Sequence, residues 1–332
     1  MRLTGLNYPL ASDDRYEFLP LRESAADGGF AMLPKAPPRS GQVGFLYVPP
    51  YRIQGISVAG EQTVVQIPEL DIAFDIGMCP RIALSSPYVA LSHGHMDHVG
   101  GLPYYFSQRT FQKMGVGKCV CHAALAGPLS RMMQSWVDLE QQRTPFEIIP
   151  LRGDEQIEIK NNIFLRGIEV SHTVPSLSYV VIERRSKLKS EFFDLPQERL
   201  RELKREGVQI TRTLEIPLIA YTGDTEMGPY LFRDEFVGAP IVICECTFFE
   251  ADHQKRARIG KHIHVQDLVK LLEVWQAQAV VLIHLSRRTN MLAAREALAS
   301  LLGPEQVSRV HFLMDHRANR ERYEQQQLEV NT

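Results

Sequence analysis

The sequence lacks the features that mark membrane-anchored and secreted proteins. No apolar run approaches the roughly 18–20 residues that a membrane-spanning helix needs. The first residues, MRLTGLNYPLASDDRYEF, do not show the basic stretch followed by an apolar stretch that is typical of a signal peptide. We therefore expect a cytoplasmic protein.

Cysteine is scarce, and the 5 residues present are an odd number, which argues against a disulfide scaffold. Four of them form two Cys-x-Cys pairs in strand-like runs, Cys119 with Cys121 and Cys244 with Cys246. Because side chains alternate along a strand, each pair places both sulfurs on one face. We expect buried thiols, with a second zinc site made from the two pairs as the alternative.

An excess of positive charge is also absent, since 37 Lys and Arg face 39 Asp and Glu and the formal net charge is −2. That balance excludes a global basic field that attracts nucleic acid, so RNA or DNA binding would depend on a local patch. The 332 residues are 44% hydrophobic and 23% charged, as in an ordinary globular protein with a sizeable core.

The most informative stretch is SHGHMDHVGG at residues 92–101, which offers His93, His95, Asp97 and His98. It follows YVAL, a short apolar run typical of a buried strand. Imidazole nitrogens and carboxylate oxygens bind zinc and similar ions, and a tight loop can direct several of them to one point. We therefore expect a metal-binding loop here rather than a solvated histidine-rich turn.

Polar side chains also stand at the ends of later strand-like runs. They are His172 after IFLRGIEV, Asp224 after the run at 217–221, Glu245 in IVICEC and His284 after VVLI. Asp75, at the end of another strand, is expected to orient the metal loop, or else to cap a turn. Because functional residues gather where strand ends converge, the sequence predicts that these side chains share one site.

These segments, in this order, resemble the metallo-β-lactamase superfamily and, within it, the RNase Z branch of tRNA 3′-end processing endonucleases. The matching segments are FDIG (74–77), SHGHMDHVGGLP (92–103), SHTVPSLSYVV (171–181), TGDT (222–225), ECTF (245–248), His262-Ile263-His264 and LIHLSRR (282–288). HTVPS and ECTF are more specific to the branch than the histidine loop, which the whole superfamily shares. The likeness is strongest to the short plant-type enzymes.

The resemblance implies an α/β protein with the metallo-β-lactamase αβ/βα four-layer sandwich and a centre of two divalent metal ions, usually Zn²⁺. It assigns His93, His95 and His172 to one ion, Asp97, His98 and His284 to the other, and Asp224 to a bridging position. Mn²⁺ and Fe²⁺ are equally compatible with this spacing. Seven ligands for two ions leave room for a bridging hydroxide, as a catalytic site needs.

The implied function is a metal-dependent endoribonuclease, or phosphodiesterase, that processes the 3′ end of tRNA. The bridging hydroxide attacks the phosphodiester and His262, oriented by Glu245, acts as the general acid for the leaving oxygen. The catalytic candidates are thus Asp97, Glu245 and His262, and His264 is a weaker candidate for the acid. The implied partners are precursor tRNA or another RNA and a second copy in a homodimer, with no membrane.

The chain departs from the bacterial-type enzymes in two places. The region 52–67 has no P-x-K-x-R-N loop, and the interval 183–214 has no Gly-Pro pair of the kind found in their tRNA-binding arm. The alternative is therefore a dinuclear zinc hydrolase of the same fold that acts on small phosphodiesters, thioesters or lactones. A non-catalytic binding protein is disfavoured because none of the seven ligands is missing.

We expect three parts along the chain. Residues 1–50, with Gly-Gly and Pro-Pro pairs, predict an irregular N-terminal segment. Residues 51–316 form the hydrolase domain, in which 183–214 is a charged insert or arm with a helix that begins near Pro196 and ends before Gly207. Residues 317–332 are expected to be a polar C-terminal tail.

Overall fold

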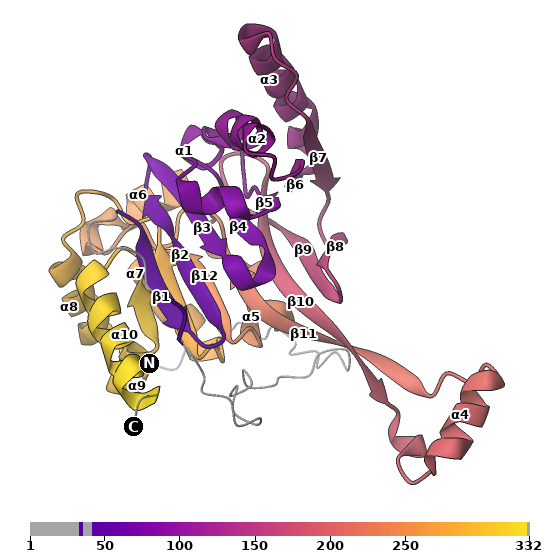
Figure 1. Cartoon of the computed structure of the whole chain (residues 1–332). Coiled ribbons are helices and arrows are strands. Elements are labelled where there is room, and N and C mark those ends of the chain that lie inside the picture. The colour runs from indigo at the N-terminus through magenta and orange to yellow at the C-terminus, as the bar shows by residue number, and fades with distance from the viewer. Residues whose placement is uncertain (1–32, 36–41, 331–332) are drawn as a thin grey trace.

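The structure, a computed structural model, describes residues 33–35 and 42–330, which form two seven-stranded sheets packed face to face (Figure 1). The first sheet has the order β1 (Gly44–Val48), β2 (Tyr51–Val58), β3 (Gln62–Ile67), β4 (Ile72–Phe74), β5 (Tyr88–Ala90), β6 (Gly117–His122) and β7 (Phe146–Leu151). The second has the order β14 (Val310–Phe312), β13 (Ala279–Ile283), β12 (Ile241–Glu245), β11 (Thr211–Tyr221), β10 (Ser176–Leu188), β9 (Ile163–Val170) and β8 (Gln156–Lys160).

Helices cover the outer faces of the sheets and connect the parallel strands. The α-helices are α1 (Met96–Val99), α2 (Leu102–Phe111), α3 (Ala123–Glu140), α4 (Gln197–Arg205), α5 (Asp234–Val237), α6 (Gln254–Gly260), α7 (Val265–Val274), α8 (Met291–Leu301), α9 (Pro304–Ser308) and α10 (His316–Val330). Short 3₁₀ helices are η1 (Pro68–Leu70), η2 (Arg81–Ser85), η3 (Ser190–Phe192), η4 (Pro229–Phe232) and η5 (Ala251–His253). No helix in the described part of the chain has both the length and the apolar composition that crossing a membrane requires.

Alternating side chains on the central strands build the layers. In β12, Ile241 and Ile243 join the core between the two sheets, whereas Val242 and Cys244 join the core under α5 and α7. A third core lies between the first sheet and helices α2 and α3. The strands are therefore apolar on both faces, and the predicted four-layer sandwich is confirmed.

The cysteines are free thiols, and both Cys-x-Cys pairs are buried. Cys119 and Cys121 lie in the core beside α2 and α3, whereas Cys244 and Cys246 lie in the core of the other outer layer. Because the two sheets separate the pairs, the four sulfurs do not form one zinc site.

The two ends of the described chain differ in detail from the sequence-based expectation. Strand β1 lies inside the stretch 1–50, for which we expected irregular chain, and it pairs with β2 along its whole length. The stretch expected to be a polar tail is mainly helix α10, which packs against β1 and buries Tyr323 and Asn319. The rest of the segment before residue 42, apart from residues 33–35, lies outside the described residues, and the three-part division stays a prediction.

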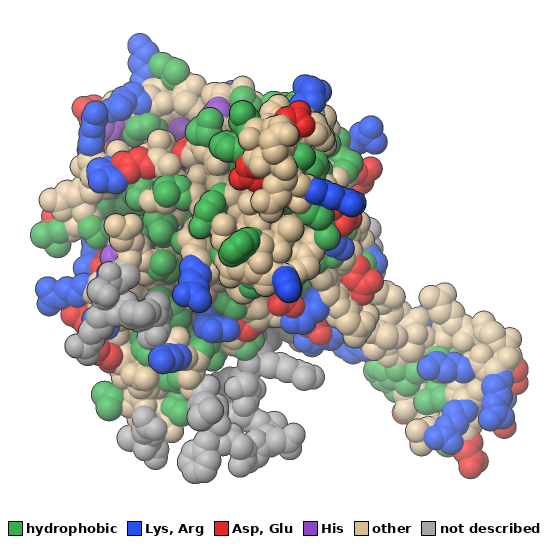
Figure 2. Space-filling model, turned by 45° about the horizontal axis from the view of Figure 1, so that its top comes forward, with side chains coloured by type: hydrophobic (Ala, Val, Ile, Leu, Met, Phe, Trp, Pro, Cys, Tyr) green, Lys and Arg blue, Asp and Glu red, His purple; other side chains and the backbone are tan. Residues whose placement is uncertain are grey.

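The insert at 183–214 forms an arm that projects from the body (Figure 1). Strands β10 and β11 continue their antiparallel pairing outward to Leu188 and Thr211, and α4 lies at the tip. The helix begins after Pro196, and Gly207 follows it with a φ of 80°, a conformation that favours glycine. Figure 2 shows side chains of both charges at this projecting end.

Candidate metal centre

Strand ends at one rim of the sandwich carry the seven metal-ligand candidates and Glu245, whereas His262 and His264 lie between α6 and α7. Strands β4, β5 and β6 are parallel, as are β11, β12 and β13, and β9 runs in the same direction as β11 because both are antiparallel to β10. The carboxyl ends of these strands therefore meet at the same rim. The ligand candidates follow β5 (His93, His95, Asp97 and His98), β9 (His172), β11 (Asp224) and β13 (His284), and Glu245 is the last residue of β12. The second half of the histidine loop forms the short helix α1.

The structure brings the seven metal-ligand candidates into overlapping groups whose possible ligand atoms lie within 4.8 Å of one another. One group is His93, His95 and His172, in which Nδ1 of His95 lies 3.0 Å from Nε2 of His93 and 3.4 Å from Nε2 of His172. Another is Asp97, His98 and His284. These are the same two sets that the resemblance implies.

Asp224 lies between the two sets. Its Oδ2 is 3.2 Å from Nε2 of His284, 3.3 Å from Nε2 of His98 and 3.8 Å from Nε2 of His93. One carboxylate oxygen thus faces imidazoles of both groups, as a bridging ligand must.

Two buried atoms at this point indicate that a cation belongs here. Nε2 of His98 and Oδ1 of Asp224 have no hydrogen-bond partner among the described residues. Buried polar atoms are almost always satisfied, and a divalent ion would satisfy both. The donor set of imidazole nitrogen and carboxylate oxygen suits zinc or a similar first-row ion, so the residues fit the metal centre that the fold implies.

Contacts behind the site fix the orientation of the rings. Nδ1 is engaged in each of four histidines: His93 with the Ser92 hydroxyl (2.9 Å), His98 with Asp75 (2.8 Å), His172 with the Lys261 carbonyl (3.1 Å) and His284 with the Thr247 hydroxyl (2.9 Å). Each ring therefore directs Nε2 at the site, which is the usual role of such outer contacts in metal centres.

Asp75 organises the histidine loop, as the sequence led us to expect. Its fully buried carboxylate accepts hydrogen bonds from the Ser92 amide (2.6 Å), the Ser92 hydroxyl (2.8 Å), Nδ1 of His98 and the Tyr221 hydroxyl (2.5 Å). The carboxylate thus ties β4 and β5 to β11 across the two sheets.

The electrostatics of the centre favour three neutral histidines around ionised carboxylates, whereas Asp224 and Asp75 outweigh burial and raise the pKa of His98 well above its usual value. Burial lowers the pKa of His93, His95 and His172. Burial alone would raise the pKa of Asp224, but His284 and His98 outweigh it and hold that pKa well below its usual value. Neutral imidazole and ionised carboxylate are the forms that bind a metal ion.

His262 lies beside these groups and pairs with Glu245. Nδ1 of His262 is 2.9 Å from Oε1 of the fully buried Glu245. Burial opposes protonation, but Glu245, with Asp224 further off, raises the pKa of His262 to about 9. The imidazole is therefore protonated at neutral pH. His264 differs, because its Nδ1 accepts from the Gln266 amide and caps α7.

Three residues of the site were not assigned a role from the sequence. Thr247 contacts both Glu245 and His284, the Lys261 carbonyl accepts from His172, and Tyr221 donates to Asp75. Thr247 stands inside the ECTF segment, two residues after Glu245, and that position is the signal that points to it. A backbone carbonyl such as that of Lys261 leaves no signal in the sequence.

Comparisons with known proteins agree with this geometry. Residues 85–285 match the model of the family described as β-lactamase superfamily domain. The chain is 32% identical to the chloroplastic tRNase Z TRZ2 of Arabidopsis thaliana over 76% of this chain and 72% of that protein. It is 31% identical to tRNase Z TRZ1 of the same plant over 76% of this chain and 92% of that protein.

A solved structure shows the same fold. The metallo-β-lactamase fold protein YhfI from Bacillus subtilis superposes with a TM-score of 0.50 at 15% identity, covering 81% of this chain and 94% of that chain. The family match, the plant relatives and the clustered His/Asp groups lead to the same conclusion: the chain belongs to the metallo-β-lactamase superfamily and to its tRNase Z branch.

Proposed function

We propose that this protein is a metal-dependent endoribonuclease that processes the 3′ end of precursor tRNA. The observation that carries the proposal is the His262–Glu245 pair, in which a buried carboxylate holds an imidazole directly beside the His/Asp groups. The two plant relatives, named tRNase Z, support tRNA as the substrate.

We propose two Zn²⁺ ions as the resident metals, with Mn²⁺ and Fe²⁺ as alternatives. His93, His95 and His172 would hold one ion, Asp97, His98 and His284 the other, and Asp224 both. When bound, such a pair activates water as the nucleophile at neutral pH and stabilises the phosphoryl oxygens.

The chain supplies the proton for the leaving group. His262 holds a proton at Nε2 while Nδ1 is bound to Glu245, and it gives that proton to the 3′ oxygen as the P–O bond breaks. Water adds to phosphorus, so the tRNA keeps a 3′-hydroxyl and the trailer keeps a 5′-phosphate. The attacking water releases a proton to solvent, and the now neutral imidazole takes one up before the next turnover, when the carboxylate of Glu245 again stabilises the imidazolium.

We propose that the arm contacts phosphates of the tRNA. Between Arg184 and Arg212 it carries nine Lys and Arg against five Asp and Glu. At the tip, Arg201, Lys204 and Arg205 are exposed and have no acidic partner among the described residues, whereas Arg199 pairs with Glu202. Replacing Lys204 and Arg205 by Gln should raise KM for tRNA and reduce its dependence on salt.

The resemblance also implies a homodimer, which we propose for this chain. The exposed apolar side chains of Phe111, Trp136 and Leu139 on α2 and α3 offer a surface for a second copy. Sedimentation of the parent and of the double variant Trp136→Glu with Leu139→Glu compares their oligomeric states. A dimeric parent and a monomeric variant would support the homodimer, and a monomeric parent would contradict it.

The cytoplasmic location expected from the sequence stays a prediction.

The general-acid role can be tested with two leaving groups. Bis-p-nitrophenyl phosphate has a leaving group that needs little help from an acid, whereas a ribose 3′ oxygen needs it. We expect His262→Ala to lose at least about a hundredfold in kcat on 3′-extended RNA and far less on the chromogenic diester.

His264→Asn is the matched control, because asparagine can keep the cap of α7. Equal losses on the two substrates in His262→Ala would contradict the acid role. Hydrolysis of a thioester by the parent, with no turnover of either diester, would favour the small-ester hydrolase instead.

A further inference from the structure

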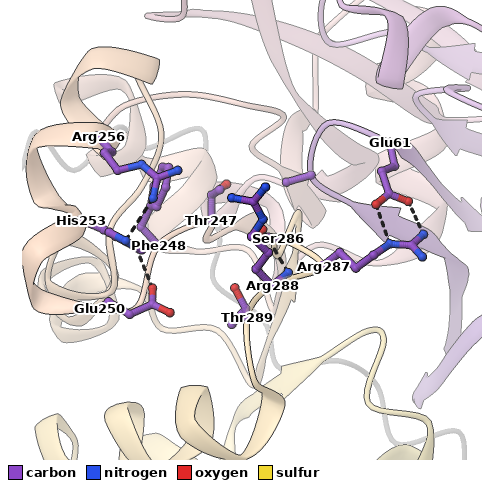
Figure 3. A pocket seen from close by; sticks show the side chains of 11 residues that line it. Glu61, Thr247, Phe248, Glu250, His253, Arg256, Ser286, Arg287, Arg288 and Thr289 are labelled. Carbon is purple, nitrogen blue, oxygen red and sulfur yellow. Dashed lines mark hydrogen bonds and ion pairs between the residues drawn. The ribbon is translucent and has the colours of Figure 1, made fainter.

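Figure 3 shows a pocket of about 520 Å³ that is lined by Thr247, whose hydroxyl contacts His284 of the metal centre. Its walls come from the turn after β2, the loop after β12 with η5 and α6, and the loop after β13. The lining side chains used below are Glu61, Thr247, Phe248, Arg256, Arg287 and Arg288. This volume is within the range of pockets that hold a small ligand.

The pocket is rich in arginine, and two of its arginines have no carboxylate partner within the described part of the chain. Glu61 pairs with Arg287, and Glu250 pairs with His253. Arg256 hydrogen-bonds to the His253 ring and lies over the Phe248 ring, 5.6 Å from its centroid. Neither Arg256 nor Arg288 has an ion pair through its guanidinium among the described residues. Two guanidinium groups are therefore available to an anion.

The pocket shares a wall with the catalytic network. Thr247 lines it and also contacts Glu245 and His284. The next residue, Phe248, lines it too, and its ring centroid is 6.1 Å from that of His262. A substrate whose leaving oxygen meets His262 can therefore extend into this pocket.

We propose that the pocket binds the nucleotide that carries the leaving 3′ oxygen. The base stacks on the Arg256 guanidinium, which itself lies over the Phe248 ring, since a planar guanidinium offers a flat surface for stacking. The phosphate on the 5′ side of that nucleotide binds Arg288 and Arg256. This inference rests on the proposed function. Because His262 is proposed to protonate the leaving 3′ oxygen, the nucleotide that carries this oxygen lies on the side of His262.

Two short RNAs distinguish this nucleotide from the trailer. One is a single-stranded oligonucleotide that ends in a 3′-hydroxyl, like the processed product, and the other begins with a 5′-phosphate, like the trailer. Their Kd values for the metal-free protein, measured by fluorescence anisotropy, report binding without any cleavage. The variants are Arg256→Gln and Arg288→Gln, and the control is Arg317→Gln, an arginine that pairs with Glu321 on α10.

We expect each pocket variant to bind the 3′-hydroxyl RNA about tenfold more weakly than the parent, with a salt slope smaller by about 0.7. Arg317→Gln should bind like the parent. In turnover of 3′-extended RNA by the metal-loaded protein, the same two variants should raise KM about tenfold and change kcat by less than about threefold.

Parent-like Kd values for the 3′-hydroxyl RNA in both variants would overturn the proposal. So would weakening that is confined to the 5′-phosphate RNA, because the pocket would then hold the trailer. Failure of the proposed function looks different: the parent would bind the 3′-hydroxyl RNA through Arg256 and Arg288 but would cleave no 3′-extended RNA.

Discussion

Nδ1 of His262 lies 2.9 Å from Oε1 of Glu245, and the carboxylate is fully buried at the end of β12. The same carboxylate accepts hydrogen bonds from the Thr225 amide and the Thr247 hydroxyl, so its position is set by the fold. The pair is therefore a preorganised unit rather than a chance surface contact.

Glu245→Gln should reduce kcat on 3′-extended RNA by about 10- to 100-fold, since a neutral amide does not stabilise the imidazolium. Because the two residues act as one unit, the double variant with His262→Ala should be no slower than His262→Ala alone. Single-turnover cleavage rates of the parent, the two single variants and the double variant check this non-additivity. Additive losses in the double variant would show that Glu245 and His262 act separately.

Thr247 links the proton donor to the metal centre. Its hydroxyl donates to Glu245 and accepts from Nδ1 of His284 at 2.9 Å, so it holds Nε2 of His284 toward Asp97. Thr247→Val should weaken metal binding by about 10- to 100-fold, whereas Thr247→Ser should stay near the parent because it keeps the hydroxyl. Metal content after dialysis against increasing concentrations of a chelator measures the metal affinity. Equal metal retention in Thr247→Val and Thr247→Ser would contradict this role of the hydroxyl.

Gly77 is required by the close approach of the histidine loop. A Cβ at this position would lie 1.8 Å from the carbonyl oxygen of Asp97 and 2.8 Å from the amide nitrogen of Thr63. Gly77→Ala should therefore displace α1 and reduce the free energy of unfolding by about 1–3 kcal/mol, with loss of bound metal. Gly303→Ala, where a Cβ meets nothing within 4 Å, is the control. Urea denaturation of both variants measures the free energy of unfolding. Similar losses of that free energy in Gly77→Ala and Gly303→Ala would contradict the account.

His311, which lies away from the metal centre, makes the free energy of unfolding depend on pH. Burial, with the Arg322 guanidinium nearby, lowers its pKa to about 4, and Arg295, Asp315 and Glu321 line the same pocket. Since the folded pKa is below the unfolded one, the unfolded chain gains the proton first, and stability falls as pH drops from about 6.5 toward 4.

His311→Gln removes this proton uptake. Relative to the variant, the parent should lose at most about 2 kcal/mol of unfolding free energy between pH 7 and pH 5. Urea denaturation at the two pH values measures the difference. An equal change in parent and variant would show that His311 does not titrate in this way.

Much of the centre could be predicted from the sequence because its ligands stand at strand ends. A buried strand has a clear apolar pattern, and a polar residue directly after it is easy to find, as with Asp224 and His284. The parallel arrangement then brings such ends together. The stretch 92–101 added the local spacing that points to metal.

Other features left no such pattern. The arginines of the pocket come from α6 and from the loop after β13, and isolated surface arginines look alike in a sequence. Strand β1 follows proline- and glycine-rich chain, and its assignment depends on pairing with β2, which is a tertiary effect. The residues of α10 are mostly polar, so its packing against β1 was not evident from the periodicity.

The most direct test of the account is cleavage of one precursor tRNA with a short 3′ trailer by the metal-loaded protein, with both product ends mapped. We predict one cut after the discriminator base, a 3′-hydroxyl on the tRNA and a 5′-phosphate on the trailer, with the cut lost in His262→Ala. Hydrolysis of bis-p-nitrophenyl phosphate without any cleavage of the tRNA would contradict the proposed substrate while leaving the metal centre in place.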